Sequence, residues 1–172
     1  MDDQLTLQTI GILLTGFTVS IAAIYYTLTL RYTRRNQDLQ LKTRQAQLFM
    51  QIYSQWNSME MGREYQRVID SEWTDIDDFL EKDYTDIESK TGFRTVARFF
   101  EGIGVLVHRG LIDVTFVDDL MSGATIRYWE KIAPMIKEWR IRYNWPQAVE
   151  WVEYLYNQVK PIVEEQHPEL KT

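Results

Sequence analysis

Four side chains near the middle of the sequence could act as acids, bases or charged ligands of one site. They share a polar stripe of a predicted helix: Arg94, Arg98, Glu101 and His108. The first three are four and three residues apart, so they lie on neighbouring turns of one helix face. A partly buried Glu101 whose charge is held by Arg98, with His108 as a titratable neighbour, would form a polar site that can exchange a proton.

A structural interpretation of the same stripe is an ion pair within the helix. The chain has only two His and no Cys, and no Ser, Asp or metal-ligand spacing accompanies Glu101 and His108. The pattern therefore does not indicate a catalytic nucleophile with its activating base. Without Cys, the chain can form neither thiolate metal sites nor disulfides. We expect Arg94, Arg98 and Glu101 to form a structural polar cluster, and we expect no enzyme activity, cofactor or metal.

Carboxylates are also concentrated between Asp70 and Glu88, where nine acidic residues accompany one base, Lys82. A calcium-binding loop needs oxygen ligands at fixed offsets and a Gly at its sixth position, and this segment contains no Gly. The pattern favours a solvated acidic connection with a short helix near Ile76 to Leu80.

The helix that carries the polar stripe is the most apolar part of the chain outside its N-terminal segment. From Phe93 to Arg109 the apolar residues recur at three- and four-residue spacing, which predicts a helix at the centre of a core. Gly110 is placed to end this helix in a left-handed conformation, and Asp113 is placed to cap the next one.

Two other segments show a helical apolar stripe. One runs from Leu39 to Trp56, and the other is Ile126, Trp129, Ala133, Ile136, Trp139 and Tyr143. Pro134 should bend or restart the second helix, Trp145-Pro146 should begin the last helix, and Pro161 should kink or end it. With 8 Gly and 4 Pro, the sequence predicts an all-α fold: a helical bundle of about five helices.

The elements that carry these stripes follow an uncharged segment from Leu5 to Leu30. Its 26 residues, at about 1.5 Å each, are long enough to cross a hydrocarbon core of about 30 Å. We interpret it as one transmembrane helix that continues towards the helical domain. A cleaved signal peptide and a buried soluble helix are the alternatives; the acidic leader disfavours the first and the aromatic flank disfavours the second.

The flanks of the span predict its orientation. The N-terminus is acidic, whereas the other end carries the proposed membrane-interface residues Tyr25, Tyr26, Arg31, Tyr32, Arg34 and Arg35. Because Lys and Arg favour the cytoplasmic side, we expect a single-pass protein of the cell (cytoplasmic) membrane with its N-terminus outside and its C-terminal domain in the cytoplasm.

Small residues form a candidate helix-packing face within the span: Gly11, Thr15, Gly16, Ser20 and Ala23. Such residues let membrane helices approach closely, although they are also common in membrane helices generally. The expected domains are a membrane anchor with a basic stop at 1–35, a cytoplasmic helical domain at 36–165 and a flexible tail at 166–172.

Charge limits the partners of the helical domain. Five of the 19 basic residues and three of the 25 acidic residues precede Gln45, which leaves a net charge of −8 from Gln45 onward. Binding to nucleic acid or to an anionic membrane surface requires clustered Lys and Arg. We therefore expect no nucleic-acid partner, and contact with the lipid bilayer only through the span and its basic flank.

Three segments of the sequence resemble those of a known family: RQAQLFMQIYSQWNS, ARFFEGIGVLVHRGLID and RYWEKIAPMI. With them the chain resembles a family of uncharacterised prokaryotic single-pass, membrane-anchored helical proteins over about Arg44 to Arg142. The C-terminal Trp/Tyr-rich helix lies beyond this resemblance. The resemblance implies a fold and no activity.

Three functional hypotheses follow from these features. The first is a non-enzymatic accessory or scaffolding subunit that associates with other membrane protein subunits or with itself as a homo-oligomer, because the chain combines an anchor with 23 aromatic residues. The second is a membrane-tethered sensor that binds a small ligand between the Phe93–Arg109 helix and the Trp129 stripe. An enzyme that uses Glu101 and His108 is the third hypothesis.

Overall fold

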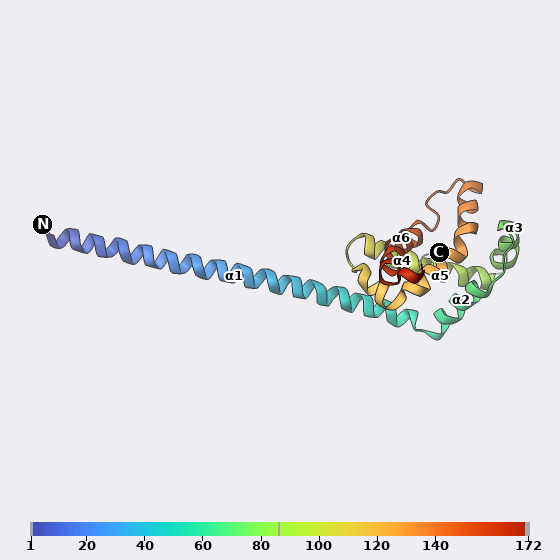
Figure 1. The fold of residues 1–172 in the computed structure, drawn as a ribbon, viewed down its shortest axis with the longest axis horizontal. Coiled ribbons are helices and arrows are strands. Elements are labelled where there is room, and N and C mark those ends of the chain that lie inside the picture. Colours follow the sequence, from blue (N-terminus) through green and yellow to red (C-terminus); the bar gives the residue numbers. More distant parts are fainter. Residues whose placement is uncertain (1, 86, 171–172) are drawn as a thin grey trace. The chain divides into compact units, whose positions relative to one another are not determined.

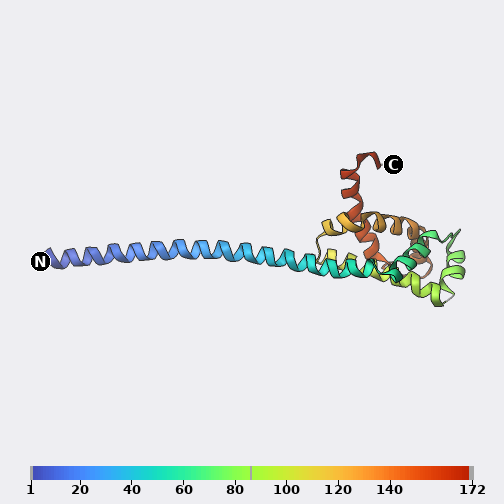
Figure 2. The same ribbon diagram turned by 90° about the horizontal axis from the view of Figure 1, so that it is seen from below.

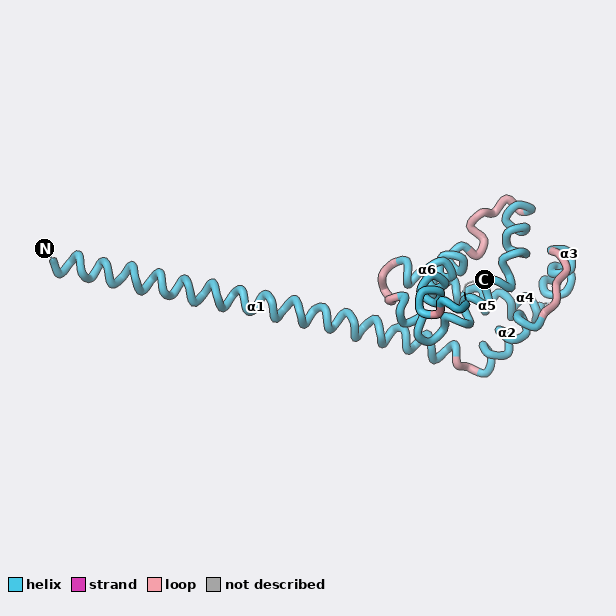
Figure 3. Tube along the Cα trace, viewed as in Figure 1, coloured by secondary structure: helices cyan, strands magenta, loops and turns pink. Residues whose placement is uncertain are grey.

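The computed structural model describes residues 2–85 and 87–170, and helices are the only regular elements in those ranges. Figure 3 shows helix throughout, joined by short loops. The α-helices are α1 (Asp2–Trp56), α2 (Met59–Asp70), α3 (Ile76–Phe79), α4 (Ile87–His108), α5 (Val114–Arg142) and α6 (Glu150–Gln166); a π-helical turn spans Leu80–Tyr84 and a 3-10 turn spans Pro168–Leu170 (Figure 1). The all-α prediction is confirmed.

The chain divides into two compact units, residues 1–44 and 45–172. The first unit consists of the N-terminal part of α1, which is the one described helix that is long and apolar enough to cross a membrane. Its best 18-residue window has a mean hydropathy of 1.8, and none of that window is buried within the structure. The large apolar side chains of this unit therefore lack protein neighbours that would shield them from water.

Hydroxyl side chains within α1 are satisfied by the helix itself. The hydroxyls of Thr9, Thr15, Thr18, Ser20 and Thr27 each donate to the carbonyl oxygen four residues earlier, at 2.8 to 2.9 Å. A polar group in hydrocarbon is costly unless it is hydrogen-bonded, so these internal bonds make the hydroxyls compatible with lipid. The Thr content of the segment does not argue against a membrane span.

The second unit is built around α4, as its apolar stripe predicts. Val96, Phe100 and Ile103 are completely or almost completely buried. Helix α4 packs against α2 and α6, and α5 packs against α6 (Figure 2). The last turns of α1 also belong to this unit, where the ring of Trp56 lies 5.6 Å from that of Phe99 and 5.4 Å from that of Phe100.

The corner between α4 and α5 has the predicted chemistry. Gly110 adopts a left-handed conformation with φ of 66°, which a residue without a Cβ adopts at little cost. The carboxylate of Asp113 then accepts a 3.0 Å hydrogen bond from the backbone N–H of Thr115. Both the helix stop and the helix cap are confirmed.

Of the two effects predicted for each proline, a bend or a break in the helix, the break does not occur. Helix α5 does not restart at Pro134, and α6 continues through Pro161 to Gln166. Both rings are on exposed faces of their helices, where water can solvate the carbonyl that loses its partner. Buried turns on either side hold α5 together, as Ile132 and Ile136 do around Pro134, and the buried Val159 precedes Pro161 in α6.

The start of α6 also differs. The helix begins at Glu150 rather than directly after Trp145-Pro146, and its N-cap is Val149 in a left-handed conformation with φ of 57°. A β-branched residue rarely adopts this conformation, and the Val149 side chain cannot accept the hydrogen bond that a helix N-terminus needs. The first amides of α6 must therefore find an acceptor elsewhere.

Candidate ligand-binding site

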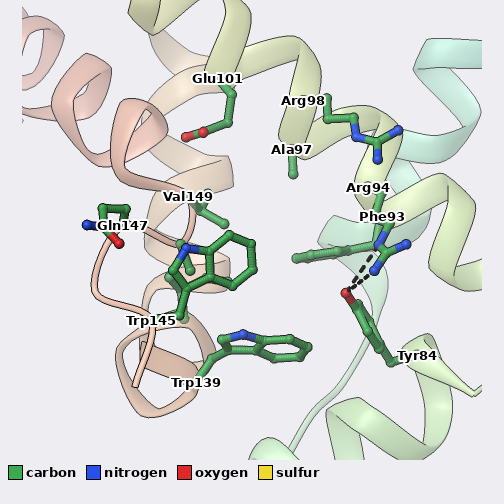
Figure 4. A pocket seen from close by; sticks show the side chains of 12 residues that line it. Tyr84, Phe93, Arg94, Ala97, Arg98, Glu101, Trp139, Trp145, Gln147 and Val149 are labelled. Atoms are coloured by element: carbon green, nitrogen blue, oxygen red, sulfur yellow. Dashed lines mark hydrogen bonds between the residues drawn. The ribbon is translucent and has the colours of Figure 1, made fainter. Parts of the chain in front are cut away.

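A cavity of about 300 Å³ opens between α4, α5 and the segment that joins α5 to α6. This volume lies at the lower end of the range of small-molecule sites, about 300 to 1,000 Å³. Its lining is shown in Figure 4 and consists of Tyr84, Phe93, Arg94, Ala97, Arg98, Glu101, Ile136, Trp139, Trp145, Gln147, Ala148 and Val149.

Four aromatic rings contribute to the apolar lining. The rings of Phe93, Tyr84, Trp139 and Trp145 surround the same space in Figure 4. Tyr84 and Trp139 meet edge to face with centroids 4.9 Å apart, which fixes the orientation of both rings. Trp145 lies in the connecting segment and is 54% exposed, so one wall of the cavity is open to solvent.

Two arginines project from α4 on the same side of the cavity (Figure 4). The guanidinium of Arg94 donates from Nε and Nη2 to the hydroxyl oxygen of Tyr84, at 3.1 and 2.7 Å. Its carbon Cζ also lies 5.1 Å from the centre of the Tyr84 ring. Tyr84 therefore holds Arg94 in place before any ligand arrives. Arg98 lies one turn further along α4, and both arginines are exposed.

Glu101 lies on the opposite side of the cavity and points to the start of α6 (Figure 4). Its Oε1 accepts hydrogen bonds from the backbone N–H groups of Trp151 and Val152, at 2.8 and 3.0 Å. These are the amides that Val149 cannot satisfy. Glu101 thus caps α6 from another helix, which is an arrangement that local sequence rules do not describe.

The partners of Glu101 differ from the predicted one, Arg98. Within the described ranges, no ion pair joins Glu101 to Arg98, because the carboxylate turns toward α6 instead. Burial raises the pKa of Glu101, and the hydrogen bonds from Val152 and Trp151 oppose that shift. The nearby charge of Glu150 also raises the pKa, whereas that of Arg140 lowers it.

A close helix contact and a half-buried arginine hold the segment beside Glu101. A Cβ at Gly104 would overlap the backbone carbonyl of Trp151, so α4 and α6 approach closely only because residue 104 is Gly. Arg140 donates from Nε to the carbonyl of Ala148 at 2.9 Å and pairs through Nη1 with Glu153 at 2.5 Å. The cavity wall at Ala148 is therefore held by α5.

Three of the four residues in the predicted polar stripe share a site. Arg94, Arg98 and Glu101 all line the cavity, but His108 does not. Its imidazole packs on the rings of Trp151 and Tyr154, with centroids 4.7 and 5.2 Å away. Sequence patterns do not identify Tyr84, Trp145 or residues 147–149 as lining residues. The excess of aromatic residues near the C-terminus is a signal for Trp145 alone among them.

The acidic segment forms local contacts. The carboxylate of Asp75 caps α3 by accepting from the N–H of Asp78, and Asp78 accepts from the N–H of Thr74. The hydrogen bond from Lys82 is the largest cause of the lowered pKa of Asp78. Within the part of the chain that the structure describes, no three His, Asp or Glu residues gather as metal ligands.

The residues predicted for the membrane lie on the exposed surface of α1. This holds for Tyr25, Tyr26, Arg31, Tyr32, Arg34 and Arg35 at its basic end, and for Gly11, Thr15, Gly16, Ser20 and Ala23 in the small-residue face. A Cβ on Gly11 or Gly16 would meet no atom within 4 Å, so the chain itself leaves this face open.

Comparisons with known proteins yield a single finding. No curated protein and no solved structure matches the chain. The family model described as "Domain of unknown function (DUF4760)" matches residues 6–159. The match includes most of α6, so it is wider than the resemblance seen in the sequence, which covers about Arg44 to Arg142. It confirms that the chain belongs to an uncharacterised family. The chain belongs to the DUF4760 family.

Proposed function

We propose that this protein is a non-enzymatic, membrane-tethered sensor whose helical domain binds a small ligand. The observation that carries the proposal is the cavity between α4 and α5. Its lining combines apolar rings with three convergent charged side chains, as small-molecule sites generally do. It also lies between the Phe93–Arg109 helix and two members of the Trp129 stripe, Ile136 and Trp139, which is the region where the sensor hypothesis expects a ligand.

The anchor is the N-terminal part of α1, in the cytoplasmic membrane. The basic flank from Arg31 to Arg35 supports an orientation with the N-terminus outside and the helical domain in the cytoplasm. The chain has no Cys, so single Cys residues can be introduced without removing native ones. A membrane-impermeant maleimide should label Asp3→Cys in intact cells and should label Glu165→Cys only after the membrane is opened. The reverse pattern would contradict this orientation.

Helix α4 supplies a route from the cavity to α1. Its residues Ala97, Arg98 and Glu101 line the cavity, while Phe99 and Phe100 contact Trp56 in the last turn of α1. A ligand that binds better to one position of α4 than to another would change the contacts of Trp56. Such differential binding is the thermodynamic requirement of a sensor.

The proposal is tested by thermal unfolding of the full-length protein in detergent with aromatic acids, aromatic bases and neutral aromatic compounds. A ligand at 100 times its Kd stabilises the folded state by about 2.7 kcal/mol. We expect at least one class to raise the unfolding temperature in a concentration-dependent way. If every class leaves it unchanged at millimolar concentration, the sensor proposal is wrong.

A second candidate function is an accessory or scaffolding subunit that binds other membrane protein subunits or a second copy of itself. The open small-residue face of α1 supports it, because Gly16 and Ser20 would let another helix approach closely. The double substitution Gly16→Leu and Ser20→Leu should then reduce the size of the assembly in mild detergent. Ile12→Leu with Val19→Leu is the control. Equal assembly sizes in both variants would mean that the small-residue face does not mediate association and that α1 serves only as a membrane anchor.

A further inference from the structure

We propose that the cavity binds a flat aromatic acid of one or two rings, with its carboxylate held by Arg94 and Arg98. This inference rests on the proposed ligand-binding function and specifies the ligand class. The shape, the charge and the preorganisation of the lining each support it.

The shape of the lining favours a flat ligand. Phe93, Trp139 and Trp145 present ring surfaces to one space (Figure 4). Stacking between aromatic rings contributes about 0.5 to 1.5 kcal/mol per pair beyond the burial of area. A planar ring between these side chains gains contacts on both of its faces, whereas a branched aliphatic body of the same volume does not.

The charge of the lining favours an anion. Arg94 and Arg98 are the two cationic lining residues, and Glu101 is the one anionic residue. The Glu101 carboxylate already accepts two backbone hydrogen bonds at the positive end of α6, so part of its charge is compensated within the chain. The charge that remains available to a ligand is therefore positive.

Preorganisation favours a carboxylate near Arg94. The Tyr84 hydroxyl engages Nε and one terminal nitrogen, Nη2, while Nη1 remains available to a ligand. Arg98 projects from the same side of α4 one helical turn away, and we expect it to supply the second guanidinium group for the carboxylate. Charge-assisted hydrogen bonds of this kind are about twice as strong as neutral ones.

The aromatic rings alone would also suit an organic cation, but the chain already places two cations over one of them, the ring of Tyr84. Lys90 Nζ lies 4.5 Å from the centre of the Tyr84 ring, and Arg94 Cζ lies 5.1 Å from it. A cationic ligand would compete with these side chains and be repelled by them. The lining thus discriminates against a cation of the same shape.

The experiment compares three probes of nearly the same shape and different charge: 2-naphthoate, 2-naphthamide and 2-naphthamidine. Binding to the full-length protein in detergent is measured by calorimetry and by quenching of tryptophan fluorescence, to which Trp139 and Trp145 should contribute. We expect 2-naphthoate to bind at least about tenfold more tightly than the neutral amide, and the amidine to bind most weakly.

Variants locate the carboxylate. Arg98→Met should remove most of the preference for 2-naphthoate over 2-naphthamide and leave the affinity for the amide unchanged. Arg109→Met is the matched control, because it removes an exposed arginine that does not line the cavity, and it should keep the preference.

The possible outcomes separate the ligand class from the function. Equal binding of acid and amide, or tighter binding of the amidine, overturns the acid class while the cavity remains a ligand site. An unchanged preference in Arg98→Met overturns the assignment of the carboxylate to the arginines. If none of the three probes binds, the inference is wrong, and the broader set of compounds in the unfolding experiment then decides the sensor proposal.

Discussion

The Oε1 atom of Glu101 accepts a 2.8 Å hydrogen bond from the backbone N–H of Trp151, a residue 50 positions later in the chain. The same oxygen accepts from the next amide, that of Val152, at 3.0 Å. One carboxylate therefore stabilises the N-terminus of α6 and lines the candidate ligand site. The stability of the domain and the state of the cavity should depend on the same side chain.

Removing this cap should destabilise the domain. We expect Glu101→Ala to lower the free energy of unfolding by about 1 to 3 kcal/mol, because two partly buried amides lose their acceptor. Glu101→Gln should cost less, since its amide oxygen can still accept a hydrogen bond. Urea unfolding of the full-length protein in detergent at pH 7 measures both changes. Equal losses in the two variants would show that the acceptor oxygen is unimportant.

The titration of Glu101 should appear in the pH dependence of stability. Burial raises the pKa of Glu101 above its ordinary value of 4.5, so between these two values the folded state binds more protons than the unfolded state. The free energy of unfolding then falls as pH rises from about 4.5 to the raised pKa, and changes little above it.

The Glu101→Gln variant isolates this effect, because Gln does not titrate. The stability of the wild type minus that of Glu101→Gln should decrease as pH rises through this range. Urea unfolding of both proteins at a series of pH values provides the measurement. A difference that increases with pH would mean that the hydrogen bonds from α6 outweigh burial and lower the pKa.

The close approach of α4 and α6 can be tested at Gly104. Gly104→Ala should destabilise the domain by about 1 to 3 kcal/mol, since its Cβ would overlap the backbone of Trp151, which cannot move as a side chain can. Gly102→Ala is the matched control in the same helix: it is exposed, has open space around it, and should stabilise by about 0.5 to 1 kcal/mol. Thermal or urea unfolding distinguishes the two. Stabilisation by Gly104→Ala would contradict the helix contact.

Gly110 tests the corner between α4 and α5. Gly110→Ala should cost about 1 kcal/mol, because its φ of 66° is unfavourable for any residue with a Cβ. Gly123→Ala lies within α5, faces open space and should instead stabilise the helix. The two unfolding free energies should therefore change in opposite directions. A shared direction of change would contradict a left-handed Gly110.

The sequence predicts those features that depend on residues close together in the chain. The apolar stripe from Phe93 to Val107 identifies the core helix, and Gly110 with Asp113 identifies the corner that follows. Spacing also places Arg94, Arg98 and Glu101 on one helix, and all three line the cavity. Local rules suffice here because each signal lies within a few turns of its effect.

The features that the sequence does not predict depend on distant contacts. Helical spacing predicts an ion pair between Glu101 and Arg98. The hydrogen-bond donors to Glu101 come from α6 instead, because folding brings that distant segment beside α4. Trp145 and Val149 enter the cavity wall because Arg140 holds the connecting segment. Pro134 is tolerated because buried neighbours on both sides maintain α5, which overrides the local preference of proline.

The most direct test of the ligand site is to fill the cavity and measure binding. Ala97 lines it, and Ala97→Leu places extra methyl groups in its apolar part. Calorimetry with 2-naphthoate should give an affinity at least about tenfold lower for Ala97→Leu than for the wild type, with both proteins folded at the temperature of the measurement. Equal affinities would place the probe elsewhere and contradict the assignment of this cavity as the ligand site.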